Sequence, residues 1–208
     1  MSMKVGIMSD VHADAALTEA AFTVFQQQQV DRVLCAGDIA GYGDQLEQTV
    51  ALLQQHPCDV VQGNHDVWYG PDKDAYQQVV ADYLHELPLY TEYLLQGKKV
   101  YMVHANPPDA YMGGIKLLDE YAELIDEEVD YWSDQLVSFD YDVLIVGHTH
   151  QVFAEYLGGT LVINPGSTKF NYCCAILTLP EMQVEFFPLN GKRISRVWNW
   201  GAYRMTLE

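Results

Sequence analysis

Histidines follow directly upon short apolar runs in the second half of this chain. Residues 143–152 read VLIVGHTHQV, so a branched apolar run stops at Gly147 and presents His148 and His150 with only Thr149 between them. His104 stands behind another apolar run, in MVHANPP. Imidazole nitrogens are common ligands of divalent transition metals. The spacing therefore raises the hypothesis that these side chains meet at a metal.

Aspartate, asparagine and further histidine side chains occupy the corresponding positions in the first third of the chain. The segments SDVHAD, GDIAGYGD and GNHDVW supply Asp10, His12, Asp38, Asn64, His65 and Asp66. A lone histidine behind a strand is usually a hydrogen-bonded loop residue, and Gly-Asp marks ordinary turns. The joint set favours a metal site, because each buried polar group needs a partner and these ligand types suit divalent ions.

The secondary-structure elements that must position these residues are predicted strands that alternate with predicted helices. Short apolar runs predict strands at residues 4–9, 32–37, 59–63, 98–104 and 142–147. Helical periodicity predicts helices at residues 16–29, at 44–55 with Asp44 as N-cap, and at 72–87, closed by Pro88. Ligands of such α/β sheets bind at the carboxyl edge of the strands, where the polar residues above lie.

The second half is richer in strands. Hairpins are expected around Gly97 and Gly158, with further strands at 171–179 and 183–189, and the acidic stretch 117–130 reads as the solvated face of a helix. This combination predicts two sheets packed face to face with helices outside, a layered α/β sandwich. The length of 208 residues fits a single domain over residues 1–208.

The charge and composition of the chain limit the classes of molecule that it is expected to bind. Eleven Lys and Arg against 29 Asp and Glu give a formal net charge of −18, which argues against a nucleic-acid duplex or an anionic membrane as partner. A field of that sign attracts cations. With no apolar run near the length of a membrane span, we expect a cytoplasmic protein, and its four cysteines are expected to be buried reduced thiols.

The motif order DVH, GD, GNHD, H and GHTH, followed by NPGS at residues 164–167, resembles the calcineurin-like metallophosphoesterases. Among these, the chain looks most like the small YfcE-like phosphodiesterase group. The resemblance implies a four-layer α/β/β/α sandwich. It also implies that Asp10, His12 and His150 hold one metal, that Asn64, His104 and His148 hold a second, and that Asp38 bridges both.

The chemistry implied is hydrolysis of small phosphodiesters by a hydroxide that bridges two divalent ions. Manganese is expected, with iron, nickel and zinc as alternatives, since mixed Asp, Asn and His ligands suit all four. Phosphomonoesters or nucleotide polyphosphates are alternative substrates. A binding scaffold that kept the fold and lost catalysis is a third reading, which the complete ligand set disfavours.

Residues beside the expected ligands have open roles. His65 is the candidate for protonating the leaving group, and Asp66 either orients it or caps a turn. Gln62 stands where protein Ser/Thr phosphatases and symmetrical diadenosine tetraphosphate hydrolases of this superfamily carry arginine, which disfavours both classes. Lys169 is either a phosphate contact or a surface lysine.

Two segments have alternative interpretations. Residues 105–114, with Tyr111 and Met112, form either a lid over the metals or a surface loop stiffened by prolines. The tail brings together Trp198, Trp200 and Tyr203. These rings either stack on a nucleobase or, as the spacing favours, pack on the domain or on a second subunit of a homo-oligomer.

Overall fold

The structure is a computed structural model that describes residues 2–70 and 75–198. Its strands form two five-stranded sheets. The first has the order β10-β9-β1-β2-β3, with bounds Gln183–Pro188, Cys173–Leu179, Met3–Met8, Arg32–Cys35 and Cys58–Val60. The second has the order β4-β5-β6-β8-β7, with bounds Tyr90–Leu95, Lys98–Val103, Val143–Ile145, Thr160–Pro165 and Val152–Leu157.

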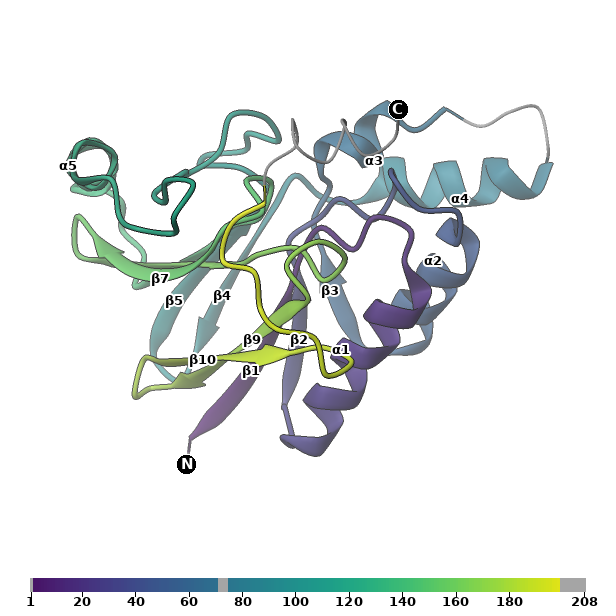
Figure 1. Ribbon diagram of the computed structural model, residues 1–208, viewed down its shortest axis with the longest axis horizontal. Helices are drawn as coiled ribbons and strands as arrows, with labels where there is room; N and C mark the ends of the chain where they lie inside the picture. The colour runs from purple at the N-terminus through teal and green to yellow at the C-terminus, as the bar shows by residue number, and fades with distance from the viewer. Residues whose placement is uncertain (1, 71–74, 199–208) are drawn as a thin grey trace.

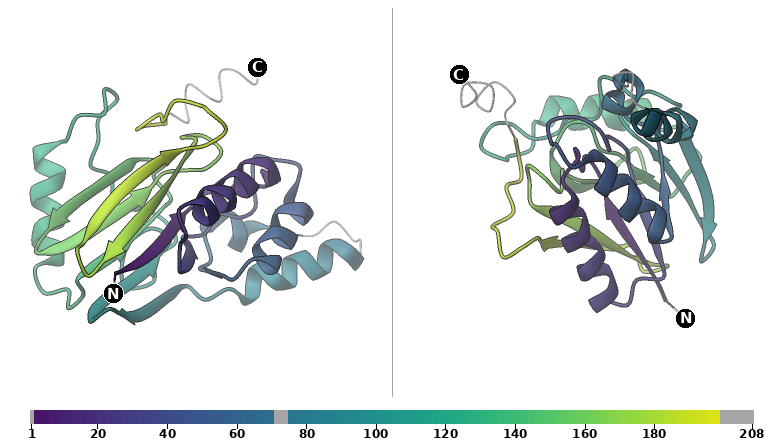
Figure 2. Two further views of the ribbon diagram at one scale, coloured as in Figure 1. Left: turned by 90° about the horizontal axis from the view of Figure 1, so that it is seen from below. Right: turned by 90° about the vertical axis from the view of Figure 1, so that its right-hand side faces the viewer.

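The helices lie outside the two sheets (Figure 1, Figure 2). Three of them, α1 (Ala15–Gln27), α2 (Leu46–Gln55) and α4 (Ala75–Glu86), lie on the side of the first sheet, and α5 (Asp126–Leu136) lies against the second. A short helix, α3 (Asn64–Trp68), follows β3. The order of layers is helix, sheet, sheet, helix, and the expected four-layer sandwich is confirmed.

Three apolar clusters hold these layers together. The central cluster fills the space between the sheets, with Ile7 and Leu177 from one side and Met102 and Ile163 from the other. A second cluster joins the first sheet to its helices, and a third joins the other sheet to α5. Each fully buried aliphatic side chain contributes about 1.5 to 3 kcal/mol to folding. The sheet edge that carries the polar residues is therefore held by a rigid double layer.

Parallel pairing fixes where the polar residues emerge. β1 pairs in parallel with β2, and β2 with β3, while β5 pairs in parallel with β6. β8 is also parallel to β6, and within each sheet these parallel strands end at the same edge. The other pairings are antiparallel: β9 pairs with β1, β4 with β5, β7 with β8, and β10 with β9.

The structure corrects two local predictions. The acidic stretch 117–130 is helical only from Asp126, because Leu117 and Leu118 are fully buried and the Gln151 side chain accepts hydrogen bonds from both of their amides, at 2.8 and 2.9 Å. Asp44 is not the N-cap of α2. That position belongs to Gln45, whose side-chain oxygen instead accepts from the Ala15 amide at 3.2 Å.

Candidate metal centre

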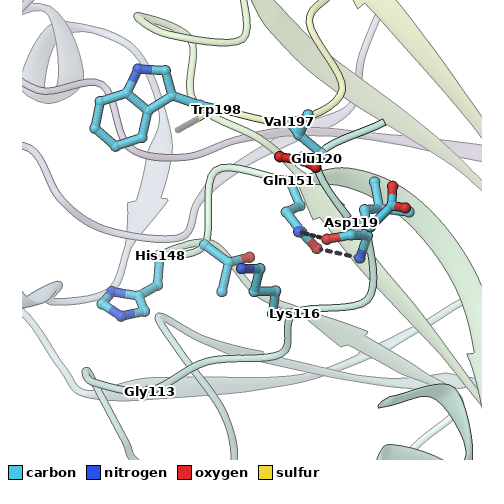
Figure 3. Close-up of a pocket in the computed structure, with 10 residues that line it drawn as sticks. Gly113, Lys116, Asp119, Glu120, His148, Gln151, Val197 and Trp198 are labelled. Atoms are coloured by element: carbon cyan, nitrogen blue, oxygen red, sulfur yellow. Dashed lines mark hydrogen bonds between the residues drawn. The ribbon is translucent and has the colours of Figure 1, made fainter. Parts of the chain in front are cut away.

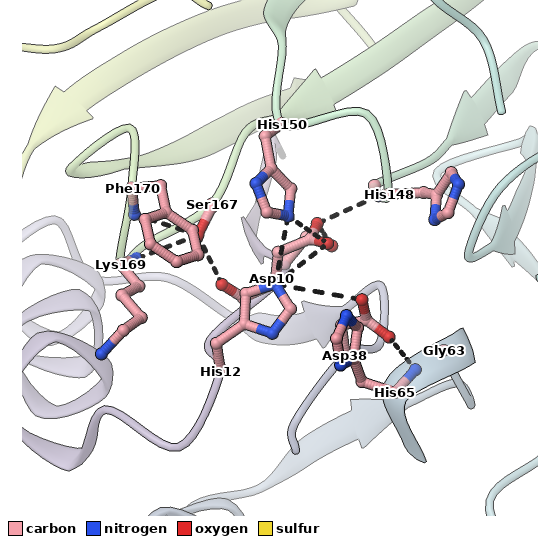
Figure 4. A network of polar contacts seen from close by, with 12 residues as sticks. Asp10, His12, Asp38, Gly63, His65, His148, His150, Ser167, Lys169 and Phe170 are labelled. Carbon is pink, nitrogen blue, oxygen red and sulfur yellow. Dashed lines mark hydrogen bonds and ion pairs between the residues drawn. The ribbon is translucent and has the colours of Figure 1, made fainter. Parts of the chain in front are cut away.

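The seven residues expected to hold metals come together at one edge of the two sheets. Figure 4 shows the side chains of Asp10, His12, Asp38 and His150 close together, with the backbone amide of His148 directed at Asp10. Asp10 and His12 follow β1, Asp38 follows β2, and Asn64 begins α3 directly behind β3; on the second sheet, His104 follows β5, while His148 and His150 follow β6. Both sheets thus contribute side chains to one candidate site.

The backbone at these positions has an uncommon conformation. Five of the seven residues have a positive φ, between 46° and 65°, and they are Asp10, His12, Asp38, His148 and His150. The left-handed region costs a non-glycine residue about 1 to 2 kcal/mol. Such strain persists only where the surroundings fix the backbone, and it concentrates at functional sites. The tight turns behind β1, β2 and β6 direct the side chains inward.

One group of donors surrounds Asp10. His150 Nε2 lies 3.1 Å from Asp10 Oδ1 and 3.1 Å from His12 Nε2, and His12 Nε2 lies 3.9 Å from the same Asp10 oxygen. The other ring nitrogen of His12 contacts the Ala40 carbonyl at 2.9 Å, which fixes the ring. All three side chains are buried. Three ligand atoms therefore face a common point.

A second group of donors lies on the other side of Asp38. His104 Nε2 is 3.5 Å from Asp38 Oδ1 and 3.2 Å from Asn64 Oδ1, and His148 Nδ1 is 2.8 Å from that same amide oxygen. Asp38 Oδ2 instead faces His12 Nε2, at 3.9 Å. The two oxygens of Asp38 are thus directed toward different groups of histidines, as a bridging ligand requires.

Burial and charge together set the protonation of the site. Burial outweighs the nearby Asp38 and Asp10 carboxylates and lowers the pKa of His12 to about 4, whereas for His104 the Asp38 carboxylate overcomes burial and raises the pKa to about 10. Burial would raise the pKa of Asp10, but His150 holds it well below the ordinary value. The two aspartates are therefore anionic, and the interior of the site favours positive charge.

This donor set fits divalent metal ions. Imidazole nitrogens and carboxylate oxygens lie within 4.8 Å of one another in two groups, Asp10 with His12 and His150, and Asp38 with His104 and His148. His12 Nδ1 carries the hydrogen that the Ala40 carbonyl accepts, so Nε2 of the neutral ring presents a lone pair toward His150 Nε2 and Asp10 Oδ1, as a metal ligand does. Nitrogen and oxygen donors in this combination suit manganese, iron, nickel and zinc.

His65 lies at the open side of the first group. Its half-buried ring is centred 5.0 Å from that of His12 and 4.8 Å from that of Tyr42. Gly41 makes room for it, since a Cβ there would lie 2.3 Å from His65 Nδ1. A ring nitrogen of His65 is also within ligand reach together with His12 and Asp38. Its position suits both proton transfer and metal binding.

Asp66 has a different function from His65. Its fully buried carboxylate accepts hydrogen bonds from the backbone amides of Ile39, Ala40 and Gly63, at 2.8, 2.9 and 2.9 Å. Burial and the neighbouring Asp38 raise the pKa of Asp66 to about 7, while these amides lower it. The contacts support the capping role over a direct role on the His65 ring. Asp66 joins the turn behind β2 to the start of α3.

A supporting layer behind Asp10 is missing from the sequence-based interpretation. Ser9 Oγ donates to Asp10 Oδ2 at 2.6 Å, and Ser167 Oγ donates to the Asp10 carbonyl at 2.6 Å. Asn164 donates to the Gly147 carbonyl at 2.9 Å. The NPGS segment therefore holds the loops that carry the ligands. Serines are common enough that nothing in their spacing indicates this role.

Gly147 allows two loops of the candidate site to approach each other closely. Its φ is not positive, so a sharp left-handed turn is not the cause. A Cβ at this position would lie only 2.0 Å from Ser9 Oγ and 2.6 Å from Asp10 Oδ2. Glycine lets the loop behind β6 approach the loop behind β1 directly, which brings the ligands of the two sheets together.

The remaining candidate residues lie around this centre. Lys169 forms an ion pair with Asp14, the N-cap of α1, with 3.2 Å between Nζ and Oδ2. The end of the 105–114 loop lies against the loop that carries His148, because a Cβ on Gly114 would lie 3.0 Å from the His148 side chain. Met112, earlier in the same loop, is exposed. Of the aromatic tail, Trp198 lies near His150, with ring centroids 4.6 Å apart. Trp200 and Tyr203 lie outside the described residues.

The chain is similar to known proteins over most of its length. Residues 3–181 match the model of the calcineurin-like phosphoesterase superfamily domain. Two relatives come from Methanocaldococcus jannaschii: the uncharacterized protein MJ0912 is 26% identical over 78% of this chain and 68% of its own, and the phosphodiesterase MJ0936 is 25% identical over 85% and 87%. The Yfce phosphoesterase of E. coli superimposes with a TM-score of 0.54 at 19% identity, covering 90% of this chain and all of that one.

Within residues 2–70 and 75–198, no helix has the length and apolar character needed to cross a membrane.

Proposed function

Because this chain belongs to the calcineurin-like phosphoesterase superfamily, whose members use divalent metals, we propose that it hydrolyses small phosphodiesters at a centre of two divalent ions. The observation that carries the proposal is the position of Asp38. Its two carboxylate oxygens face His12 on one side and His104 on the other, at 3.9 and 3.5 Å. A single carboxylate between two groups of imidazoles is an arrangement suited to a pair of ions.

Each side chain has a proposed role. Asp10, His12 and His150 would hold one ion and Asn64, His104 and His148 the other, with Asp38 shared. When bound, such a pair lowers the pKa of water, provides the nucleophile and neutralises the charge of the phosphate. His65 is the proposed general acid, which would donate a ring proton to the departing ester oxygen. Its half-buried position at the open side of the site allows contact with substrate.

The preference for diesters has a basis in charge. Gln62 is buried and donates to the Leu84 carbonyl at 2.9 Å, so its side chain is directed away from the site. Lys169 is paired with Asp14. Gln62 is uncharged and the charge of Lys169 is already paired, so neither side chain neutralises the second negative charge of a phosphomonoester. The whole chain, in addition, carries a net charge of −18. A diester, with one negative charge at the phosphate, suits this environment better than a monoester dianion.

Manganese is the proposed ion, because two histidines and a carboxylate or amide oxygen at each position are ligands that this ion accepts. Iron, nickel and zinc accept them as well, and the supply of ions decides among them in the cell. The monoesterase and the nucleotide polyphosphate hydrolase are the alternative activities. A purely binding role is the remaining alternative, in which the strained, buried donor set would be retained without catalysis.

The test compares bis(p-nitrophenyl) phosphate with p-nitrophenyl phosphate, using chelator-treated protein with and without added Mn²⁺. We expect release of p-nitrophenol only with metal and a higher kcat/KM for the diester. A higher value for the monoester would favour the alternative activity. Full metal binding without hydrolysis of either ester would contradict the proposal and favour a binding role.

A further inference from the structure

A segment beyond the matched domain returns to the metal centre. The family model ends at residue 181, before β10, and the chain after β10 runs back across the ends of the strands (Figure 1). Two backbone contacts fix it there: the Val152 amide donates to the Arg196 carbonyl at 2.8 Å, and the Ser195 amide donates to the Asn171 carbonyl at 3.1 Å. The segment is therefore attached to the loops around the site.

Asn171 connects this segment directly to a candidate ligand. Its side-chain amide donates to the His150 carbonyl at 2.9 Å and to the Ser195 carbonyl at 2.7 Å. Arg196 adds a hydrogen bond from Nε to the Val152 carbonyl at 3.3 Å. The position of the next residues, Val197 and Trp198, is thus coupled to the backbone that carries His150.

Trp198 lies beside the metal centre as a consequence. Its ring is stacked on that of Phe170, with centroids 4.4 Å apart and planes at 24°. The Trp198 centroid is also 4.6 Å from that of His150. Phe170 in turn stacks on His150 at 5.3 Å. These rings form an apolar wall at the edge of an otherwise polar, anionic site.

Of these rings, Trp198 borders a cavity of about 730 Å³ that reaches the centre at His148. Figure 3 shows Trp198 on one side of this space and the segment with Lys116, Asp119 and Glu120 on the other. That segment is rigid at its base, since Gln151 accepts hydrogen bonds from the amides of Leu117 and Leu118. The volume is in the range of small-ligand pockets, about 300 to 1,000 Å³.

We propose that Trp198 is a specificity-determining residue that stacks on a planar aromatic group of the substrate, such as the base of a nucleotide ester, while the phosphate lies at the metals. This inference rests on the proposed function. An indole wall next to an anionic site gains most from a flat apolar group, and stacking on bases is tolerant of their identity. Asp119 and Glu120, across the cavity, can accept hydrogen bonds from an amino group on such a base.

The test uses three p-nitrophenyl phosphodiesters that release the same leaving group: the thymidine 5′-ester, the methyl ester and the choline ester. The Mn²⁺-loaded full chain is compared with the variants W198A and W198F. The readout is the ratio of kcat/KM for the thymidine ester to that for the methyl ester, which cancels effects on the shared chemical step. Metal content is measured for each variant, because Trp198 is close to His150.

We expect W198A to lower this ratio about tenfold, since stacking on one base is of that order, and W198F to retain most of it. Tyr156→Ala, which removes an exposed ring on β7, should leave the ratio as it is. An unchanged ratio in W198A overturns the proposal. So does a selective loss of the choline ester, which would show that the indole contacts a cation instead.

A failure of the proposed hydrolysis can be distinguished from a failure of the stacking role of Trp198. If the wild-type protein binds Mn²⁺ but hydrolyses none of the three esters, calorimetric titration with thymidine 5′-monophosphate and with inorganic phosphate replaces the kinetic ratio. The proposal then requires W198A to weaken binding of the nucleotide about tenfold relative to phosphate. Equal weakening of both ligands, or no change, overturns it.

Discussion

His12 Nε2 and His150 Nε2 lie 3.1 Å apart, although 138 positions separate the two residues in the sequence. One follows β1 of the first sheet and the other follows β6 of the second. The candidate centre therefore forms across the contact between the two sheets. An ion bound there would connect both halves of the sandwich, so metal binding and folding stability should be linked.

Removal of metal should lower thermal stability. A ligand that binds only the folded state at about 100 times its dissociation constant stabilises it by about 2.7 kcal/mol. For a chain of this size, that corresponds to a rise of about 5 to 10 °C in Tm. Calorimetric scans of chelator-treated protein, with and without Mn²⁺, measure the shift. The variant His150→Ala serves as the control and should show a smaller shift. Identical midpoints for the wild-type protein would argue against a bound ion.

Asp38→Asn should impair both positions of the centre. The substitution keeps the size of the side chain but removes the negative charge that faces His12 and His104. We expect metal content, measured by elemental analysis, to fall below one ion per chain, with activity largely lost. Asp140→Asn on the surface is the matched control. Two tightly bound ions in Asp38→Asn would disprove the bridging role.

His65→Ala should separate catalysis from metal binding. A general acid contributes about 10² to 10⁴ in rate, so kcat should fall by that factor while two ions remain bound. His85→Ala removes an exposed imidazole on α4, outside the centre, and should retain activity. Loss of an ion in His65→Ala would instead assign the residue as a ligand, which its distance to His12 and Asp38 also permits.

Asp66→Asn should destabilise the fold around the site. An asparagine presents one oxygen and one amino group, so at least one of the amides of Ile39, Ala40 and Gly63 would face a donor in place of an acceptor. A buried unsatisfied group costs about 1 to 3 kcal/mol. Urea unfolding measures the loss. Asp82→Asn, on the exposed face of α4, is the comparison. Wild-type stability in Asp66→Asn would contradict the capping role.

Gly147→Ala should push apart the loops behind β1 and β6. The added Cβ would meet Ser9 Oγ at 2.0 Å, and overpacking of this kind costs about 1 to 3 kcal/mol. We expect a lower free energy of unfolding and weaker metal binding. Gly70→Ala is the matched control, because a Cβ there meets nothing within 4 Å and the residue has no positive φ. Equal effects of the two substitutions would rule out close packing at Gly147 as the cause.

The layered fold and the gathering of the polar residues at one sheet edge were predictable because their signals are local. The assignment of these residues as metal ligands comes from the family resemblance and stays a prediction. A buried strand reads as an apolar run, and the polar residue at its end is visible in the next few positions, as at Asp10, Asp38 and His104. The position of residues 117–125 was not predictable, because it depends on Gln151, which follows in the chain by more than 30 residues. The hydrogen bonds that Asp66 accepts from the amides of Ile39 and Ala40, and the contact of Trp198 with His150, also join residues far apart in the sequence.

The pairing of β1 with β9 has a consequence for the newly made chain. β1 spans Met3–Met8, yet one of its neighbours in the sheet spans Cys173–Leu179, far later in the chain. Until the ribosome has synthesised those residues, the strand that carries Asp10 and His12 lacks half of its hydrogen-bonding partners. Such distant pairings form late, because chain closure must precede them. The proposed metal centre should therefore become complete only after residues 173–179 have been synthesised and have paired with β1.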